Sequence, residues 1–459
     1  MSDNNAIGIA SPQGNAAHDA IAIIDDELLI RKVSRRLTWF LCILFFCSFL
    51  DRINTGFAAL SMNQDLGLSA TAYGLANTIF YAGYVLCEIP SNLILARVGA
   101  RIWLSRIMIT WGIASAMTMF AVGPNSLYVT RLLVGIAEAG FLPGVLLYMS
   151  YWFPPLYRAR ATSMFMVAMP VTGVIGSLVS GWLLDMHGVA GLSGWQWLFL
   201  IEGGPAVVFG VITFLYLDDR PESAKWLSVP EKVRLSSLLR DEATAAQYAA
   251  AAAQQTTVLK QLCAPAVLLL ALSYFCMVNS LNAISTWIPL IVRAVLQDGG
   301  SFAMTGVLTA FPSLVAVVAM IWWGARSDHR GERRFHVVAP MILTAVCWLL
   351  IAYAEPPLLR LLGAVGVVSG AYVAMSLFWT IPAGVLAPAA RAAGIALIAV
   401  AGNIGSAFSP TVIGWLRDTT HDFNAGLIFV SVLMLFGATI LCLLPSVATR
   451  SHALAPVQP

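Results

Sequence analysis

Charged side chains are scarce in this sequence. Asp, Glu, Lys and Arg make up 11% of the 459 residues, whereas hydrophobic residues make up 59% and the mean hydropathy is +0.80. Soluble proteins carry about 25% charged residues, so the composition excludes an ordinary soluble domain. The apolar residues fall into long runs, and a run of about 20 spans a bilayer as a helix. The sequence therefore predicts an all-α polytopic membrane protein.

The sequence also lacks the signatures of metal, redox and nucleotide chemistry. Its seven cysteines form no CxxC pair, and its six histidines show no metal-ligand spacing. There is no Walker loop and no pairing of a nucleophile with a base. We therefore expect no cofactor, no metal and no enzymatic activity. The basic stretch 326–334 lies between apolar runs, so we assign it to topology and lipid contact rather than to nucleic-acid binding.

Twelve apolar runs are present. They cover approximately residues 37–61, 73–95, 102–122, 127–150, 160–185, 196–217, 265–291, 303–324, 336–354, 358–387, 391–415 and 423–445. Of the 26 Lys and Arg residues, 21 lie in the two tails and in the loops that follow even-numbered runs. Basic residues in short loops stay in the cytoplasm, so we place both termini there. The first run is too long for the apolar part of a cleavable signal peptide.

A long polar segment, 218–262, divides the chain into six runs and six. We expect a disordered cytoplasmic tail over 1–30, a six-helix bundle over 31–217, a cytoplasmic linker over 218–262, a second six-helix bundle over 263–446 and a cytoplasmic tail over 447–459. We interpret the start of the linker, 218–222, as a solvated turn, and its alanine-rich part, 245–253, has a helical composition.

Short motifs recur in the two bundles at a nearly constant offset. Gly99 and Gly331, each in a basic loop, are 232 residues apart. Two further pairs are 231 and 233 residues apart: Arg160-Ala161 with Arg391-Ala392, and Gly181-Trp182-Leu183 with Gly414-Trp415-Leu416. Three matches near one offset indicate an internal repeat. Two pseudo-symmetric bundles place a substrate site at their interface near the bilayer midplane, and the bundles rock around it.

Four charged residues lie inside apolar runs of the first bundle: Asp51 and Arg52 in the first run, Arg131 and Glu138 in the fourth. A charge near the bilayer centre costs about 2.5–3.5 kcal/mol on insertion scales, so such residues face a protein interior or a water-filled path. The helical rise places Asp51 and Arg52 in depth between Arg131 and Glu138, which share a helix face. If the two helices adjoin, the four side chains form one cluster.

Such a cluster suits an organic anion and a proton. A guanidinium stays charged and binds a carboxylate through two parallel hydrogen bonds. Burial favours the protonated form of a carboxyl, whereas a nearby guanidinium disfavours it. An anion that arrives at the arginine therefore changes which acid holds a proton. The alternative is a buried salt-bridge network that only orients the helices.

The second bundle carries no such charges. The offset of 232 leads from the four charged positions to Ala283, Ile284, Gly363 and Gly370. Neutral polar and aromatic residues lie in the corresponding runs: Asn279, Ser280, Asn282, Ser285, Tyr372, Ser376, Trp379 and Thr380. We infer that the first bundle handles charge and protons and that the second recognises substrate shape, with Tyr372, Ser376 and Trp379 as binding candidates.

Four further polar residues leave alternatives open. Tyr84 either presents its hydroxyl to the central cavity or is an interior tyrosine. Asn403 either lines the cavity or packs between the glycines around it. For Glu88 and Glu202 we favour a structural ion pair or a role at a helix end over substrate contact.

The chain resembles the major facilitator superfamily and, within it, the anion:cation symporter family. The resemblance extends from about Arg31 to Leu444. Its most specific elements are Leu50-Asp51-Arg52-Ile53-Asn54, Glu88-Ile89-Pro90-Ser91-Asn92, Arg131 with Glu138, and Ile201-Glu202-Gly203-Gly204-Pro205. The Glu-x-Pro-Ser-Asn form is similar to the bacterial tartrate and phthalate permease branch.

The resemblance implies proton-coupled uptake of a small organic anion, such as a hydroxy-dicarboxylate, a sugar acid or an aromatic carboxylate, across a bacterial inner membrane. It implies that Asp51 and Glu138 are the proton-linked acids, that Arg52 contacts the anion, and that Arg131 is its partner or a second contact. We expect a monomer. Two departures from the family occur: the loop after the second run lacks an acidic residue, and Ala399 stands where relatives often carry asparagine.

Two other functions remain as alternatives. A proton-independent facilitator or an exporter of another small solute has the same architecture. A membrane sensor for an anion needs a soluble output domain, and the longest polar segment, 218–262, is too short for one. The sequence therefore favours transport.

Overall fold

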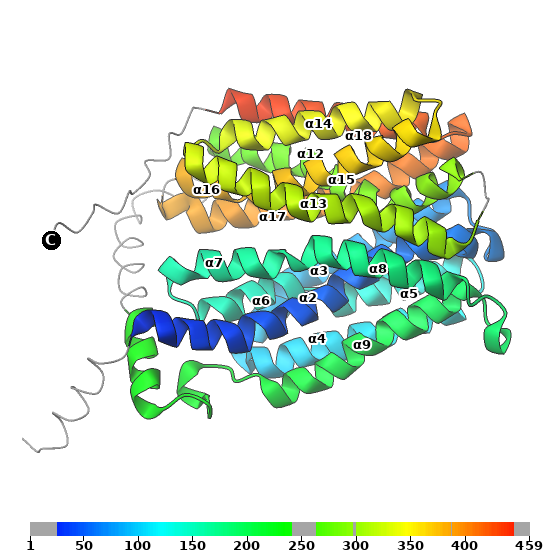
Figure 1. The fold of residues 1–459 in the computed structure, drawn as a ribbon. Coiled ribbons are helices and arrows are strands. Elements are labelled where there is room, and N and C mark those ends of the chain that lie inside the picture. The colour runs from blue at the N-terminus through cyan, green and yellow to red at the C-terminus, as the bar shows by residue number, and fades with distance from the viewer. Residues whose placement is uncertain (1–24, 241–262, 297–299, 387, 445–459) are drawn as a thin grey trace, which may run out of the picture.

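The computed structural model describes residues 25–240, 263–296, 300–386 and 388–444. All regular elements in these ranges are helices, and they form two halves that lie side by side (Figure 1). We call them the N half, α2 to α9, and the C half, α12 to α18. The all-α expectation is confirmed.

The N half contains six membrane-crossing units. They are α2 (Asp26–Asp65), α3 (Ala70–Val98), α4 (Ala100–Met117) with η1 (Thr118–Phe120), α5 (Pro124–Glu138) with α6 (Phe141–Ser150), α7 (Pro155–Met166) with α8 (Ala168–Leu184), and α9 (Gly194–Tyr216). The short helices η2 (Val189–Gly191) and η3 (Pro221–Ser223) lie before and after α9.

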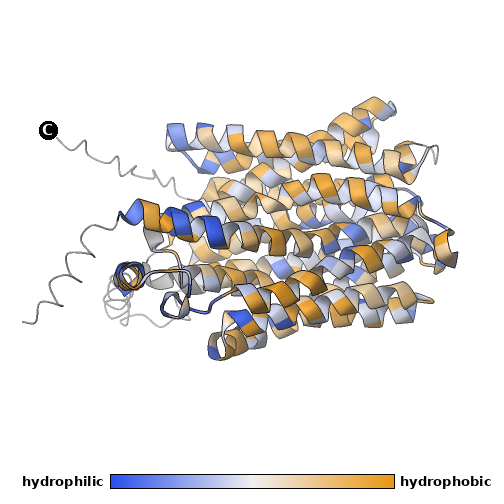
Figure 2. Ribbon diagram, turned by 60° about the horizontal axis from the view of Figure 1, so that its bottom comes forward, coloured by the Kyte–Doolittle hydropathy of each residue, from blue (hydrophilic) through white to orange (hydrophobic). Residues whose placement is uncertain are grey.

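The C half contains six further units. They are α12 (Pro265–Val295), α13 (Phe302–Arg330), α14 (Arg334–Tyr353), α15 (Pro357–Phe378) with α16 (Thr380–Val385), α17 (Pro388–Thr420), and α18 (Asn424–Leu443). Eleven helical segments of the described chain are long and apolar enough to cross a membrane. The remaining expected span is α4, which carries Arg101 and Arg106 near its start and packs along α9. Apolar residues cover the lengths of the helices, and hydrophilic ones gather at the ends (Figure 2).

Two expectations about the chain's polar segments need correction. The first helix begins at Asp26 rather than after residue 30, because the Asp25 carboxylate accepts hydrogen bonds from the backbone N–H groups of Glu27 and Leu28. The start of the linker is only partly solvated, because Pro221 is buried and the Asp219 carboxylate binds the backbone N–H of Arg101 at 2.9 Å, whereas Arg220 and Glu222 are exposed. The alanine-rich part, 245–253, lies outside the described residues.

The described part of the linker is fastened to the N half. The Trp226 indole stacks on that of Trp152 with ring centroids 5.6 Å apart. Lys32 binds Glu231 at 2.8 Å, and Arg234 binds Asp26 at 2.7 Å. These contacts tie residues 226–234 to the segment after α6 and to the start of α2.

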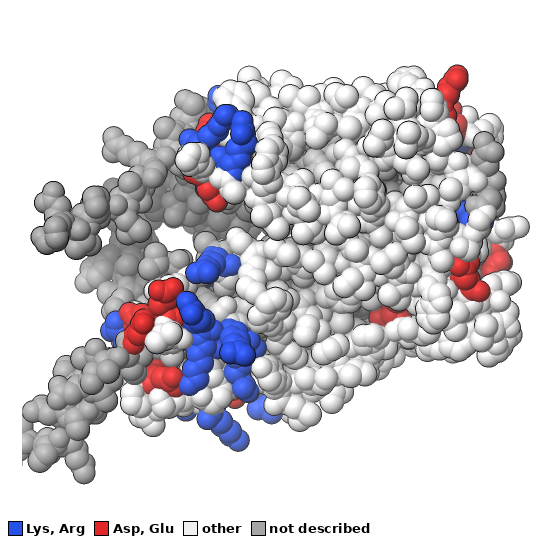
Figure 3. Space-filling view, in the orientation of Figure 1, with Lys and Arg blue, Asp and Glu red and all other residues white. Residues whose placement is uncertain are grey.

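The molecule has two ends that matter for the site. We call the end where α2 begins and α18 ends the terminal face, and the opposite end, with the turns 66–69 and 421–423, the distal face. Most visible Lys and Arg side chains gather at the terminal face (Figure 3).

The apolar core divides unevenly between these two ends. One cluster of buried residues near the distal face spans both halves and includes Phe57 and Trp195 with Trp287 and Trp348. Two other clusters lie toward the terminal face, and the buried residues of each belong to a single half. The halves are therefore joined by a common core at the distal end and keep separate cores at the terminal end.

Candidate functional site

An ion pair between Arg52 and Glu138 lies at the middle of the N half. The Arg52 Nη2 atom is 3.1 Å from Glu138 Oε1, which also accepts a hydrogen bond of 2.8 Å from the Ser48 hydroxyl. The Glu138 side chain is 1% exposed, whereas that of Arg52 is 24% exposed. The pair therefore buries its acid, whereas the Arg52 side chain stays partly accessible.

A break in the fourth membrane-crossing unit positions Glu138. This residue ends α5, Ala139 leaves the helical conformation, and Gly140 adopts the left-handed conformation with φ 84°. A Cβ atom at Gly140 would lie 2.6 Å from the Ser91 Oγ atom, so both its backbone and its surroundings require glycine. The sequence predicts one continuous run over 127–150, and the structure divides it at the acid.

Aromatic rings of α3 surround the Arg52 guanidinium. Its carbon lies 5.6 Å from the Phe80 ring centroid, 5.7 Å from that of Tyr81 and 5.6 Å from that of Tyr84. The Tyr81 hydroxyl accepts a hydrogen bond of 3.2 Å from Arg52 Nη1. Cation–π attraction of this kind stabilises a cation that has left water. Tyr84 is thus part of the site, whereas Phe80 and Tyr81 were missed, although the Phe-Tyr-x-x-Tyr spacing on one helix was a usable signal.

Arg131 lies against the same aromatic group but makes no ion pair among the described residues. Its guanidinium carbon is 4.9 Å from the Phe80 centroid, and the side chain is buried. Its Nε and Nη1 atoms are buried without a hydrogen-bond partner in the described structure. Gly135 lets α5 approach α3 closely, since a Cβ there would lie 2.1 Å from the Phe80 carbonyl oxygen, so that Arg131 reaches this ring. These two N–H donors of Arg131, which lack partners and lie near Arg52, could bind an anion with several oxygens.

Asp51 lies apart from this group, on the side of α2 that faces α4 and α9. Its Oδ1 atom accepts hydrogen bonds from Asn54 and from the Ser115 hydroxyl. The structure thus brings Arg52 and Glu138 together, sets Arg131 beside them across Phe80, and places Asp51 among different neighbours.

Polar contacts connect this group with the C half. The Tyr81 hydroxyl donates to Asn282 Oδ1 at 3.4 Å, and the Asn282 amide donates to the Ser406 carbonyl. The Asn403 amide donates to Glu88 Oε2 at 2.8 Å. Asn403 and Glu88, both left open by the sequence, therefore bind each other across the interface between the halves.

The candidates on α15 make their contacts within the C half. Tyr372 is buried, and the exposed Ser376 donates to the Val373 carbonyl of its own helix. Trp379 packs edge-on against Tyr274 with centroids 4.9 Å apart. In the described structure no hydrogen bond links these side chains to Arg52 or Glu138. Their role in substrate binding stays a prediction.

Two aspartates close the distal face by capping helices of the opposite half. Asp185, at the end of α8, accepts from the backbone N–H groups of Phe302 at 2.9 Å and Ala303 at 3.0 Å. Asp418 in α17 accepts from those of Ala70 at 3.0 Å and Thr71 at 2.7 Å, and from the Thr71 hydroxyl at 2.5 Å. Carboxylates at helix N-termini accept hydrogen bonds from the free N–H groups and interact favourably with the positive end of the helix dipole. Neither aspartate was predicted as functional from the sequence.

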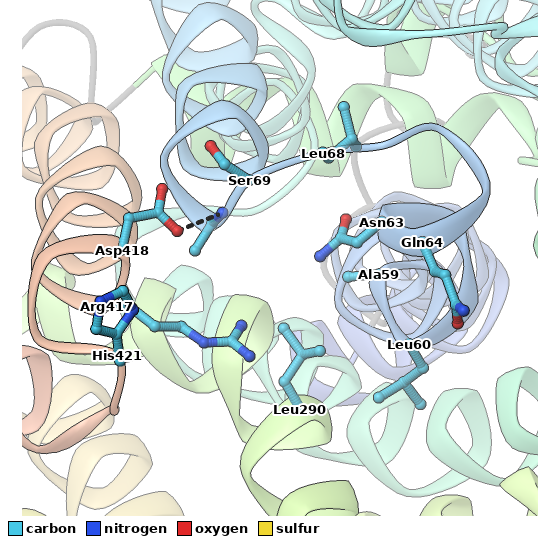
Figure 4. A pocket seen from close by; sticks show the side chains of 11 residues that line it. Ala59, Leu60, Asn63, Gln64, Leu68, Ser69, Leu290, Arg417, Asp418 and His421 are labelled. Atoms are coloured by element: carbon cyan, nitrogen blue, oxygen red, sulfur yellow. Dashed lines mark hydrogen bonds between the residues drawn. The ribbon is translucent and has the colours of Figure 1, made fainter.

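A pocket of about 540 Å³ opens beside the Asp418 cap (Figure 4). Ends of both halves line it, with Asn63 and Gln64 from the N half and Arg417 and His421 from the C half. None of the expected site residues lines this pocket. It lies outside the closed distal contact, and the residues around Arg52 lie on the other side of that contact.

Comparison with known proteins identifies the family of this chain. A family model described as Major Facilitator Superfamily matches residues 41–305 and again 294–459. The chain belongs to the major facilitator superfamily. It is therefore a membrane-spanning transporter and not an enzyme.

Several relatives in this superfamily match nearly the whole chain. A protein of Agrobacterium vitis named "Putative tartrate transporter" is 44% identical over 432 residues, which cover 94% of this chain and 98% of the relative. The quinolone resistance transporter of Acinetobacter baumannii is 37% identical, with 89% of this chain and 93% of the relative covered. The inner membrane transport protein RhmT of Escherichia coli strain K12 is 32% identical, with 90% and 95% covered.

Solved structures of the superfamily have the same fold. The inward-open xylose transporter XylE of E. coli superposes with a TM-score of 0.73 at 13% identity, covering 91% of this chain and 98% of that one. A D-xylose–proton symporter gives a TM-score of 0.71 at 15% identity, with the same coverage. This superfamily transporter therefore has the expected fold of two six-helix bundles.

Proposed function

We propose that this transporter imports a small organic anion together with protons, by alternating access between its two halves. The partly accessible side chain of Arg52 carries the proposal. It lies among the aromatic rings of α3, near the two N–H donors of Arg131 that have no partner in the described structure. A planar guanidinium binds a carboxylate well. A 44% identical relative is named "Putative tartrate transporter", and tartrate is a dicarboxylate.

Proton coupling follows from the acid that Arg52 already holds. A carboxylate of the substrate that takes the guanidinium leaves Glu138 buried without its cation, and a buried carboxyl without a cation favours its protonated form. Substrate binding and protonation of Glu138 then support each other. We assign Asp51 as a second proton-linked acid because it too is buried in the N half.

The distribution of basic residues supports an orientation. Lys and Arg gather at the terminal face, so we place that face and both termini in the cytoplasm. The separate cores at this face and the closed distal contacts then correspond to an inward-facing state. We place the transporter in a bacterial inner membrane, as for RhmT, and propose that it works as a monomer.

The test is proton influx into proteoliposomes that contain a pH dye. Tartrate, a sugar acid and an aromatic carboxylate are added outside in turn, with neutral sugars as the control. We expect internal acidification with one acid class and its loss in Asp51→Asn, while exchange of labelled for unlabelled acid continues.

Two other results would point to other functions. Labelled tartrate uptake that ignores pH would indicate a proton-independent facilitator. Extrusion of a quinolone without any response to acids would indicate an exporter, the function named for the relative from Acinetobacter baumannii.

A further inference from the structure

Two buried acids, Asp51 of α2 and Glu202 of α9, lie inside the N half and form no ion pair with any described residue. Each side chain is 3% exposed. Asp51 Oδ1 accepts from Asn54 at 3.3 Å and from the Ser115 hydroxyl, and Glu202 Oε1 accepts from the Ser180 hydroxyl at 2.7 Å. The two acids are close enough to interact electrostatically. The four helices α2, α4, α8 and α9 thus enclose one polar group.

The second oxygen of each acid has no partner. Asp51 Oδ2 and Glu202 Oε2 are buried, and no described group forms a hydrogen bond with either. From α4 and α8 the acids meet hydroxyls only, those of Ser115 and Ser180. On the far side of α2 lie Glu138, which binds Arg52 and also interacts electrostatically with Asp51, and Arg131, which lies over the Phe80 ring.

Burial makes two ionised carboxylates here unfavourable. A carboxylate removed from water without a cation costs several kcal/mol, and two of them close together repel each other. One proton on the pair removes most of this cost, and the partnerless oxygens are the atoms that can accept it.

We propose that Asp51 and Glu202 form one shared proton site. The proposal extends the proposed function, since it makes Glu202 part of the proton-handling group. A proton adds to Asp51 Oδ2 or Glu202 Oε2, which changes the pair's charge from −2 to −1, and no other bond changes. The proton leaves from the same oxygen to water. The pair, now with both carboxylates ionised, then requires hydration that the described conformation excludes. Proton release is thereby linked to an opening of the contact between α2, α4 and α9.

The site is tested on the purified full-length protein without substrate. Infrared difference spectra between pH 9 and pH 5 follow the C=O band of protonated carboxyl groups in wild type, Asp51→Asn, Glu202→Gln and the double variant. Glu355→Gln, which removes an exposed acid, is the control. In each single variant we expect the band of the remaining acid to titrate about 1 pH unit or more lower, because the repulsion has gone. The double variant loses both bands.

Three results would overturn the shared site. Unchanged midpoints in both single variants would show two independent acids. Absence of any protonated buried carboxyl in wild type across this pH range would show that the pair holds no proton. Loss of the band when NaCl replaces choline chloride would show a sodium site instead.

A second variant guards against misfolding of the acid variants. Ser180→Ala keeps both acids and removes one donor to Glu202, so the shared band should titrate higher than in wild type, and an unchanged midpoint would count against the proposal. Because no substrate is present, these results stand apart from the uptake assay. A shared proton site without acid uptake would leave this inference intact and overturn the proposed function.

Discussion

The two halves repeat one architecture but bury different chemistry. Every buried Asp, Glu and Arg among the described residues lies in the N half, namely Asp51, Arg131, Glu138 and Glu202. Apart from His336, the buried polar residues of the C half are Asn, Ser and Thr. An internal repeat therefore preserves helix positions while the chemistry of individual positions diverges.

Equivalent positions show what replaces the charge. Gly363 and Gly370 of α15 stand where α5 and its end carry Arg131 and Glu138. A Cβ at Gly363 would lie 2.7 Å from Ile351 Cγ1, and one at Gly370 would lie 2.7 Å from the Pro340 carbonyl oxygen. The C half uses these positions for close packing of α15 on α14, and the N half places charged side chains there.

Elsewhere the halves remain alike. Asp185 and Asp418, 233 residues apart, each cap a helix of the other half. The first turns of α4 and α14 each bind a carboxylate, Asp219 from the linker in one case and Glu332 from the adjacent loop in the other. The linker thus supplies the acid that the loop after the second run lacks.

The largest expected effect is at the charged side of the comparison. Arg52→Ala removes the proposed anion contact and leaves Glu138 without its cation. Hydrogen bonds to charged groups contribute about 1.5–3 kcal/mol, so KM for the transported acid should rise by roughly 10–100-fold in the proteoliposome assay. Arg52→Lys keeps the charge but not the geometry for two parallel hydrogen bonds, so its KM should lie between those of wild type and Arg52→Ala. Ile284→Val, at the equivalent position of the C half, should leave KM unchanged. A wild-type KM in Arg52→Ala would mean that the guanidinium only orients helices.

The packing side of the comparison predicts a loss of stability instead. Gly370→Ala inserts a methyl group against the Pro340 carbonyl and the Thr344 hydroxyl, and overpacking of this kind costs about 1–3 kcal/mol. Thermal unfolding in detergent should show a lower midpoint. Gly204→Ala in α9, where nothing lies within 4 Å of the new Cβ, is the control and should not change it. Equal midpoints in the two variants would contradict the packing role of Gly370.

The helix caps formed by Asp185 and Asp418, which both halves share, predict a smaller effect, on the equilibrium between a closed and an open distal face. Asp418→Asn weakens a cap with three donors, and a cap contributes about 0.5–2 kcal/mol. The equilibrium should move toward an open distal face by roughly 2–30-fold. Distances between spin labels at Gln64→Cys and Asp422→Cys, in a background without the native cysteines, would report this opening. Asp185→Asn, which weakens a cap with two donors, should shift the equilibrium less, and a larger effect there would reverse the ranking of the caps.

The smallest effect concerns the loop before α14. Burial alone raises the pKa of Glu332, but hydrogen bonds from the Phe335 N–H and the His336 ring outweigh it and lower the pKa below the usual value for glutamate. A lowered folded-state pKa stabilises the protein above the unfolded pKa of about 4.3, and this is lost as pH falls through the folded value. Glu332→Gln should therefore cost about 0.5 kcal/mol at pH 7 and less at pH 4, as measured by thermal unfolding. An equal cost at both pH values would exclude an effect of ionisation.

The sequence alone determined the class, the span count and the residues at stake. Long apolar runs are stable as membrane helices. A charged residue inside such a run is costly, which predicts that it has a functional or structural role. The repeat also predicted two halves with the charges in one. The helix break at Gly140 was not predicted, because nothing local distinguishes that glycine from those that pack inside helices.

Only the tertiary structure decided which charges meet. Asp51 and Arg52 are neighbours in the chain, but successive residues of a helix point about 100° apart. Arg52 therefore meets α3 and Glu138, and Asp51 meets α4 and α9. Which helix stands on each side of α2 depends on how six helices pack. That arrangement separates the arginine that pairs with Glu138 from a buried acid one residue away.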